Sequence, residues 1–257
     1  EGGSGVCSLL AKEVKELVEY AIMAPSGGNV QPWKWLYKNN KLMLFNDVHR
    51  SSSILNHNNA ASLLSFGAAS ENLIIKAHKM GYEVELDKFP LGVGNQLIST
   101  FCFTKNKMGT SQEHTNDDLY DEIPKRCTNR VLNKRAVLKP ESLDYLNEVI
   151  ATVEGASLKV FSEEADIEAL KDILAEVDKL FMTNKKGHSH FIKEIRWTKK
   201  EVVETRDGID INTIDLTPAE RAGLLISKNW NVTKHLKKWK LGSEFCKLSK
   251  KAVDASA

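Results

Sequence analysis

Two short stretches of this sequence combine side chains that could together hold a small molecule. The first runs from Pro25 to Trp33 and reads Pro-Ser-Gly-Gly-Asn-Val-Gln-Pro-Trp. Its glycines let the backbone approach a ligand, and Ser26, Asn29 and Gln31 offer hydrogen-bond donors and acceptors. A flat heterocycle with imide edges requires such partners. The residue types are also compatible with an ordinary helix-ending turn, in which Asn29 caps and Trp33 fills the core.

The second stretch is basic and reads Arg126-Cys127-Thr128-Asn129-Arg130. Two guanidinium groups and a hydroxyl within one short turn suit the recognition of a phosphate monoester. A solvated basic turn is the alternative that the residues leave open. Cys127 lies beside two cations that could lower the pKa of its thiol, but a redox role is the minority interpretation.

The first stretch follows a predicted helix, because apolar residues recur at helical spacing over residues 9–23 and Pro25 disfavours helical geometry before it. Two strands, over 35–37 and 42–45, are expected to form a hairpin around Asn39-Asn40. A long helix over 60–80 should stop at Gly81, and its small residues at 67–69 predict close packing. Two antiparallel strands, over 82–86 and 97–103, should follow it.

The polar stretch over residues 105–118 is the predicted boundary of a second block. This block should contain a helix beyond Pro140, a strand over 158–161, a helix with Ser162 as its N-cap, and a helix over 188–206 ended by the turn Asp207-Gly208. Thr217-Pro218-Ala219-Glu220 is a capping box that predicts a further helix start. The predicted domains are therefore a linker over 1–8, a first half over 9–118 and a second half over 119–257.

The two stretches resemble the flavin-binding signatures of the nitroreductase superfamily. The first is similar to the family's Ala-Pro-Ser-x-x-Asn-x-Gln-Pro-Trp segment, which lines the isoalloxazine ring. Ala24 precedes Pro25 as that pattern requires. The second is similar to an Arg-x-Ser/Thr-x-Arg segment that binds the phosphate of FMN. The resemblance implies a cofactor site formed by Ser26, Gly27, Asn29, Gln31, Arg126, Thr128, Asn129 and Arg130.

The order of the two segments is informative, because here the arginine segment follows the loop instead of preceding it. This order resembles the single-chain Acg-like proteins and the modules fused to ThiF-like adenylyltransferase domains. Residues 47–50 and 67–73 are also similar to stretches of that branch. The resemblance implies an α+β, nitroreductase-like fold with a mostly antiparallel sheet flanked by helices and two pseudo-symmetric halves. No counterpart completes the second half, which is therefore expected to be incomplete or degenerate.

The function implied by the resemblance is an FMN-dependent oxidoreductase that passes electrons from NAD(P)H to a quinone, nitro compound or similar acceptor. The alternative is a flavin-binding, storage or regulatory module with little turnover, in a ThiF-like fusion or associated with such a domain. The sequence names no catalytic base, and flavin chemistry of this kind does not require one. The chain is expected to be a monomeric pseudo-dimer or a homodimer.

Composition argues against several other classes of protein. The net charge of +2 does not favour nucleic acid as a partner. The four cysteines form no CxxC pair and the histidines have no metal-ligand spacing, so neither a metal site nor a disulfide framework is expected. His188 and His190 are expected at the surface. No apolar run approaches the ~20 residues needed to cross a bilayer, which predicts no membrane partner and a cytoplasmic location.

A lysine-rich stretch near the carboxyl end, with Trp230 and Trp239, could contact an anionic partner or cover a ligand. A solvated helix face is the alternative. Its basic residues are Lys228, Lys234, His235, Lys237, Lys238, Lys240, Lys247, Lys250 and Lys251.

Overall fold

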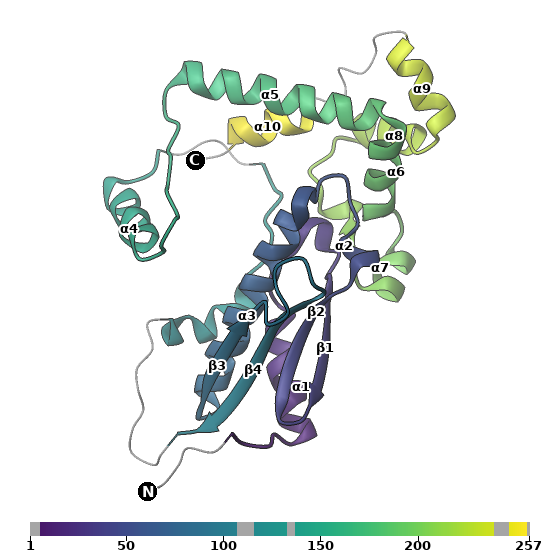
Figure 1. Cartoon of the computed structure of the whole chain (residues 1–257). Helices are drawn as coiled ribbons and strands as arrows, with labels where there is room; N and C mark the ends of the chain where they lie inside the picture. Colours follow the sequence, from purple (N-terminus) through teal and green to yellow (C-terminus); the bar gives the residue numbers. More distant parts are fainter. Residues whose placement is uncertain (1–5, 107–115, 133–136, 239–246, 256–257) are drawn as a thin grey trace, which may run out of the picture. The chain divides into compact units, whose positions relative to one another are not determined.

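The computed structural model describes residues 6–106, 116–132, 137–238 and 247–255. The chain divides into two compact units (Figure 1). Unit 1 comprises residues 1–129 and 194–210, and unit 2 comprises residues 130–193 and 211–257. Most of the predicted boundary at 105–118 lies outside the described residues. The predicted division at 118 and 119 stays a prediction.

Unit 1 is built around a four-stranded antiparallel sheet with the order β1-β2-β4-β3. Its strands are β1 (Trp33–Lys38), β2 (Lys41–Asn46), β3 (Tyr82–Lys88) and β4 (Leu97–Lys105). Asn39 and Asn40 have φ angles of 53° and 57°, as a tight two-residue hairpin turn between β1 and β2 requires. The predicted hairpin and the second strand pair are therefore confirmed. β2 also pairs with β4, and the register of that pairing shifts between Leu44 and Phe45.

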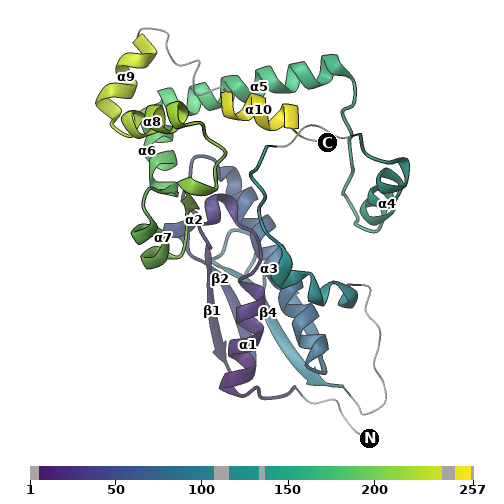
Figure 2. The same cartoon turned by 180° about the vertical axis from the view of Figure 1, so that it is seen from behind.

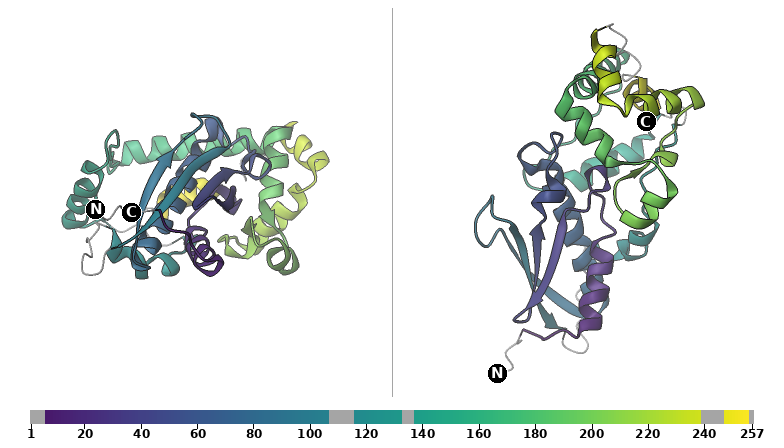
Figure 3. Two further views of the ribbon diagram at one scale, coloured as in Figure 1. Left: turned by 60° about the horizontal axis from the view of Figure 1, so that its bottom comes forward. Right: turned by 90° about the vertical axis from the view of Figure 1, so that its right-hand side faces the viewer.

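Two helices of unit 1, α1 (Ala11–Ala21) and α3 (Ala60–Lys79), lie on the same face of this sheet (Figures 2 and 3). They pack against each other and enclose a core that includes Leu17, Phe66 and Phe101, each at most 2% exposed. Burial of such side chains is worth roughly 1.5–3 kcal/mol each. α3 ends before Gly81, whose φ of 81° matches the left-handed backbone that commonly follows a helix.

Short elements complete unit 1. They are α2 (Val48–Ser51) and the 3-10 turns η1 (Gly27–Asn29), η2 (His57–Asn59), η3 (Asp117–Asp121) and η4 (Ile123–Lys125). A later segment, which returns to unit 1 from far along the chain, adds β5 (Ile195–Arg196), α7 (Lys199–Thr205) and β6 (Ile209–Asp210). β5 and β6 form a two-stranded parallel sheet.

Among the described residues of unit 2, helices are the only regular elements, and non-helical segments connect them. The unit contains α4 (Pro140–Ala151), α5 (Glu164–Thr183), α6 (Lys185–Glu194), η5 (Ile211–Thr213), α8 (Pro218–Ser227), α9 (Trp230–Lys238) and α10 (Lys247–Ala255), with the last residue of α6 belonging to unit 1. α10 lies alongside α5 (Figure 1). The capping box at the start of α8 is confirmed, since Thr217 Oγ1 accepts a hydrogen bond from the backbone of Glu220 at 3.3 Å.

The α+β class with an antiparallel sheet and flanking helices is confirmed, but three local predictions are wrong. Residues 158–161 form no strand, and α5 has Glu163 rather than Ser162 as its N-cap. The helix predicted over 188–206 is interrupted by β5, because residues 195–196 pair with 209–210. The close packing predicted for the small residues at 67–69 is confirmed at Ala69, which is fully buried in the core, but Gly67 is exposed and takes no part in it.

His188 is buried rather than at the surface. Its side chain is 4% exposed, its Nε2 lies 2.7 Å from the carbonyl oxygen of Ser227, and its ring lies 5.2 Å from that of Trp230. Contacts with α8 and α9 therefore bury His188, although its neighbours in the sequence are small or polar. Across the described part of the chain, no helix combines the length and the apolar character required to cross a membrane.

Candidate functional site

The predicted ring-binding loop follows α1 and enters β1 through a backbone of unusual geometry. Gly28, Asn29 and Gln31 all have positive φ angles, of 58°, 53° and 48°. Such angles are uncommon outside glycine, and asparagine tolerates them better than most residues. Ser26 Oγ accepts a hydrogen bond from the backbone N–H of Gln31 at 3.0 Å, which closes the loop on itself. Trp33, at 8% exposure, then anchors the start of β1 in the core.

The loop is held by the returning segment that includes α7 and β6. Asn29 pairs with Gly208 twice: its carbonyl oxygen accepts from the Gly208 N–H at 3.0 Å, and its Nδ2 donates to the Gly208 carbonyl at 3.1 Å. Gln31 Nε2 donates to the carbonyl oxygen of Arg206 at 2.6 Å. Two of the predicted ligand side chains therefore use amide donors to fix the protein's own backbone, while Asn29 Oδ1 remains able to accept.

An ion-pair network ties the same segment to the region before α3. Asp207 contacts Arg196 at 2.5 Å and Arg50 at 3.3 Å, and Arg50 also donates to the carbonyl of Val30 in the loop. Burial alone would raise the pKa of Asp207, but hydrogen bonds from Arg196 and Thr205 together hold it below its usual value. The Asp207 carboxylate therefore stays charged and keeps both arginines in place.

Glu194 presses a carboxyl group against the glycine at the centre of the loop. A Cβ atom on Gly28 would lie 2.8 Å from Glu194 Oε2, so only glycine fits there without a shift. Burial raises the pKa of Glu194, and a hydrogen bond from Ser53 Oγ at 3.2 Å opposes that rise. Glu194 is thus a partly buried acid in contact with the candidate site.

The sequence alone gives no indication that residues 194–208 contact this loop. The only signal was Asp207-Gly208, which indicated a turn but not its partner. Pairing between residues about 180 positions apart leaves no trace in local periodicity.

The arginine segment is only partly brought to the loop. The Arg126 guanidinium donates to the carbonyl of Met23 through Nε at 3.2 Å and Nη2 at 3.1 Å, which places Arg126 where α1 gives way to the loop. Thr128 and Asn129 follow in unit 1 and are exposed, as is Cys127. Arg130 is the first residue of unit 2, where Nη1 donates to Thr213 Oγ1 at 3.4 Å.

The remaining predictions concern metals and the basic carboxyl-terminal stretch. Among the described residues, no group of His, Cys, Asp and Glu has the arrangement of a metal site. In the lysine-rich stretch, Lys251 pairs with Glu220 and Lys250 with Asp172, at 2.5 and 2.8 Å. These two lysines of α10 therefore form ion pairs with the neighbouring helices α5 and α8. Trp239 and Lys240 lie outside the described residues.

Comparisons with known proteins give partial likenesses. The chain is 26% identical over 242 residues to the "Uncharacterized protein MT1398" of Mycobacterium tuberculosis, covering 94% of this chain and 32% of that protein. It is 30% identical over 77 residues to the "Putative NAD(P)H nitroreductase acg" of M. tuberculosis, covering 30% of this chain and 23% of that protein. The chain thus spans about a third or less of the relatives' lengths. No protein-family model matches it.

Among solved structures, the chain is similar to a "putative nitroreductase in complex with FMN" from Desulfovibrio desulfuricans. The two are 15% identical, with 44% of this chain and 84% of the other covered and a TM-score of 0.32. A likeness of this size supports no conclusion about the function of the chain.

Proposed function

We propose that this chain binds FMN and takes part in passing electrons from NAD(P)H to a quinone, nitro compound or similar acceptor. The observation that carries the proposal is the anchoring of Arg126 beside the loop of Ser26 to Gln31, at the Met23 carbonyl. These are the two stretches that resemble the phosphate-binding and ring-binding segments of nitroreductases. The local 30% identity to a protein named as an NAD(P)H nitroreductase adds support.

The loop offers groups that fit the polar edge of an isoalloxazine ring. The positive φ of Gly28 and the absence of side chains at Gly27 and Gly28 let a flat ring approach the backbone. Asn29 Oδ1 can accept from an imide N–H, because the Nδ2 of the same amide is already committed to Gly208. The contacts with residues 206–208 fix these groups before any ligand arrives, which favours tight binding.

The arginine segment offers groups that fit the phosphate of the same cofactor. Arg126 and Arg130 bring guanidinium forks suited to phosphate oxygens, and Thr128 and Asn129 add neutral hydrogen-bonding groups. Arg126 already bonds to a backbone carbonyl, so its position is restrained while its exposed face remains accessible. We assign the phosphate to these four residues and the ring to Ser26, Gly27, Asn29 and Gln31.

FMN, when bound, supplies the two-electron redox chemistry, while the protein positions the ring and tunes its environment. Glu194 is a further group of this site, and its raised pKa makes it a candidate proton reservoir beside the loop. Arg50, in the ion-pair network around Asp207, keeps the loop in position by bonding to both the Val30 carbonyl and the Asp207 carboxylate.

The test is reconstitution of the purified chain with FMN, followed by gel filtration and an absorption spectrum. We expect flavin bands to elute with the protein. NADH or NADPH should bleach those bands anaerobically, and a quinone or nitroarene should restore them. Co-elution without bleaching would replace this function with flavin binding or storage alone. A protein that emerges colourless would refute the proposal altogether.

A further inference from the structure

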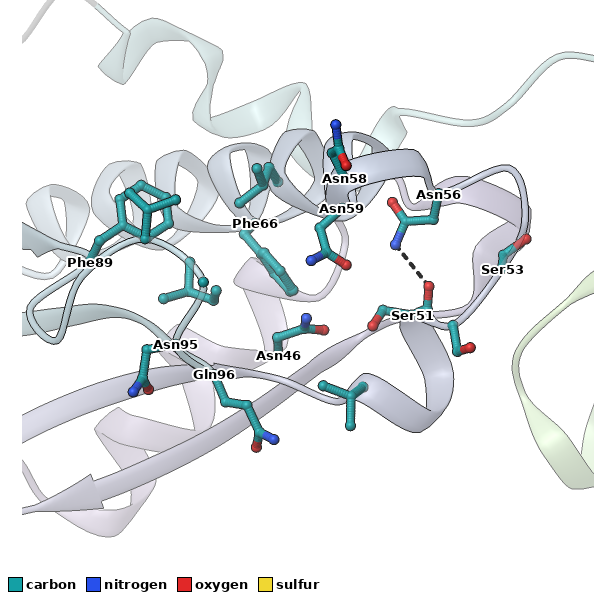
Figure 4. Close-up of a pocket in the computed structure, with 16 residues that line it drawn as sticks. Asn46, Ser51, Ser53, Asn56, Asn58, Asn59, Phe66, Phe89, Asn95 and Gln96 are labelled. Atoms are coloured by element: carbon teal, nitrogen blue, oxygen red, sulfur yellow. Dashed lines mark hydrogen bonds between the residues drawn. The ribbon is translucent and has the colours of Figure 1, made fainter.

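Unit 1 contains a second candidate site that none of the eight predicted cofactor residues lines. It is a cavity of about 400 Å³ at one end of the sheet (Figure 4). Its walls are the end of β2, the connection over residues 48–59, the first turns of α3, and the connection between β3 and β4. Cavities of this size are typical of small-molecule sites. We refer to it as the amide pocket.

The lining of the amide pocket has an uncommon chemical composition. Carboxamides dominate its polar part, which comprises Asn46, Asn56, Asn58, Asn59, Asn95 and Gln96. Three serines, at 51–53, add hydroxyl groups, and Phe66, Phe89 and Ile98 supply apolar surface. No lining residue is charged. A phosphate, carboxylate or ammonium group would therefore find no counter-ion within the lining, which selects an uncharged ligand.

Asn46 contributes a buried hydrogen-bond acceptor that has no donor in the described part of the chain. Its side chain is 8% exposed, and its Oδ1 is buried and accepts no hydrogen bond from any described residue. Figure 4 shows this side chain between Phe66 and Ser51, directed into the cavity. A buried acceptor without a donor destabilises a fold, so such atoms are rare. A ligand that donates an N–H to Oδ1 would satisfy it.

The surrounding amides do not compete for this role. Asn56 is fully used by the framework: its Nδ2 donates to Ser51 O and Ser62 Oγ at 2.8 Å each, and its Oδ1 accepts from the Ser62 N–H at 3.2 Å. Asn46 is held through its backbone, which donates to the Gln96 carbonyl at 2.8 Å. The walls of the pocket thus leave the Asn46 acceptor unsatisfied, and a small rotation of its amide would bring Oδ1 to a ligand in the cavity.

A strained residue supports the same inference. Phe89 has a φ of 54°, which is unfavourable for a bulky side chain, and its backbone N–H donates to Ile98 O at 2.8 Å. The side chain lines the pocket in this conformation. Strain of this kind is concentrated at ligand sites, where the surrounding structure maintains it.

We propose that the amide pocket binds an uncharged heterocycle of nucleoside size that carries an N–H next to a carbonyl. The ring N–H donates to Asn46 Oδ1, neighbouring carboxamides donate to the ring carbonyls, and the aromatic side chains contact the ring face. Sugar hydroxyls suit the serines of the same pocket. This inference is independent of the proposed flavin function, because the two sites share no residue.

The decisive experiment compares three probes on the full chain by titration calorimetry. Uridine carries the required imide N–H, 3-methyluridine replaces that donor with a methyl group, and uridine 5′-monophosphate adds a charged phosphate. We expect uridine to bind and both comparators to bind at least about tenfold more weakly, as loss of a buried hydrogen bond or burial of an unpaired charge requires. Equal affinity for uridine and 3-methyluridine, or no binding of uridine, would overturn the proposal.

A substitution at Asn46 tests the same hydrogen bond by changing the protein instead of the ligand. Asn46→Leu should abolish uridine binding while leaving the melting temperature equal to or above that of the wild type, since it removes an unsatisfied buried atom. A merely structural role for Asn46 predicts the opposite, a lower melting temperature. Asn147→Leu, on the exposed surface of α4, is the matched control and should leave uridine affinity unchanged. Uridine binding retained by Asn46→Leu would also refute the proposal.

Discussion

The loop from Ser26 to Gln31 and the segment from Arg126 to Arg130 are stabilised in different ways. The loop is fixed by the protein itself, through hydrogen bonds from Asn29 and Gln31 to residues 206–208. The arginine segment is largely exposed, and the guanidinium of Arg126 donates to the Met23 carbonyl. A flat ring needs a precise surface, whereas a phosphate can be bound by exposed guanidinium groups at the surface. The difference predicts that the loop controls stability and that the arginines control affinity.

The largest effect should come from removing both arginines. Arg126→Ala with Arg130→Ala should raise the dissociation constant for FMN by about a hundredfold or more, because each charge-assisted bond contributes roughly 1.5–3 kcal/mol. Fluorescence titration of FMN measures this change, and the melting temperature should barely move. Lys125→Ala removes a neighbouring exposed cation and should bind FMN normally. If the double variant keeps its affinity, the phosphate does not bind at this segment.

A large effect on stability is expected at Gly28. Gly28→Ala should lower the free energy of unfolding by about 1–3 kcal/mol, because φ is 58° and the new Cβ would lie 2.8 Å from Glu194 Oε2. Denaturant unfolding measures it. Gly27→Ala is the matched control: its Cβ would meet Ala61 at an ordinary 3.5 Å, so a change within about 0.5 kcal/mol is expected. Similar losses in both variants would contradict a specific contact at Gly28.

Glu194 should make the stability of the loop dependent on pH. Its raised folded-state pKa means that the folded protein binds the proton more tightly, so this contribution is present at low pH. The contribution is lost as pH rises from the unfolded pKa of about 4.3 through the folded pKa. Glu194→Gln should therefore raise the melting temperature at pH 8 and change it little near pH 4.

The matched control for this pH series is Glu85→Gln, at an exposed position on β3. It should leave the difference between pH 4 and pH 8 as in the wild type. A Glu194→Gln variant that melts at lower temperature at pH 8 would show that the carboxylate is stabilising, contrary to the effect of its burial.

The smallest effect should come from Gln31, whose bond to the Arg206 carbonyl is exposed. Gln31→Ala should lower the free energy of unfolding by about 0.5–1.5 kcal/mol, the usual net value of one hydrogen bond. Gln31→Glu places an acceptor against that carbonyl and should be at least as destabilising. Both follow from denaturant unfolding. An unchanged Gln31→Glu variant would show that residue 206 does not hold the loop in solution.

Local patterns in the sequence determined the main helices and strands in the first 105 residues of unit 1. Apolar spacing predicted α1 and α3, and Asn39-Asn40 predicted the hairpin, because each depends on the conformational preferences of neighbouring residues. The capping box at Thr217 likewise predicted the start of α8. By contrast, the residues at 158–161 have the composition of a strand but form none, since a strand also needs a partner.

Only the tertiary structure decided what surrounds the candidate sites. The sequence identified Asn29 and Gln31 as polar groups, but their pairing with residues 206–208 depends on a distant part of the chain returning to unit 1. The amide pocket arises in the same way, since Asn46 and Phe89 become neighbours of one cavity only when the sheet forms. Hydrogen bonding and burial depend on three-dimensional proximity, which the order of residues along the chain does not state.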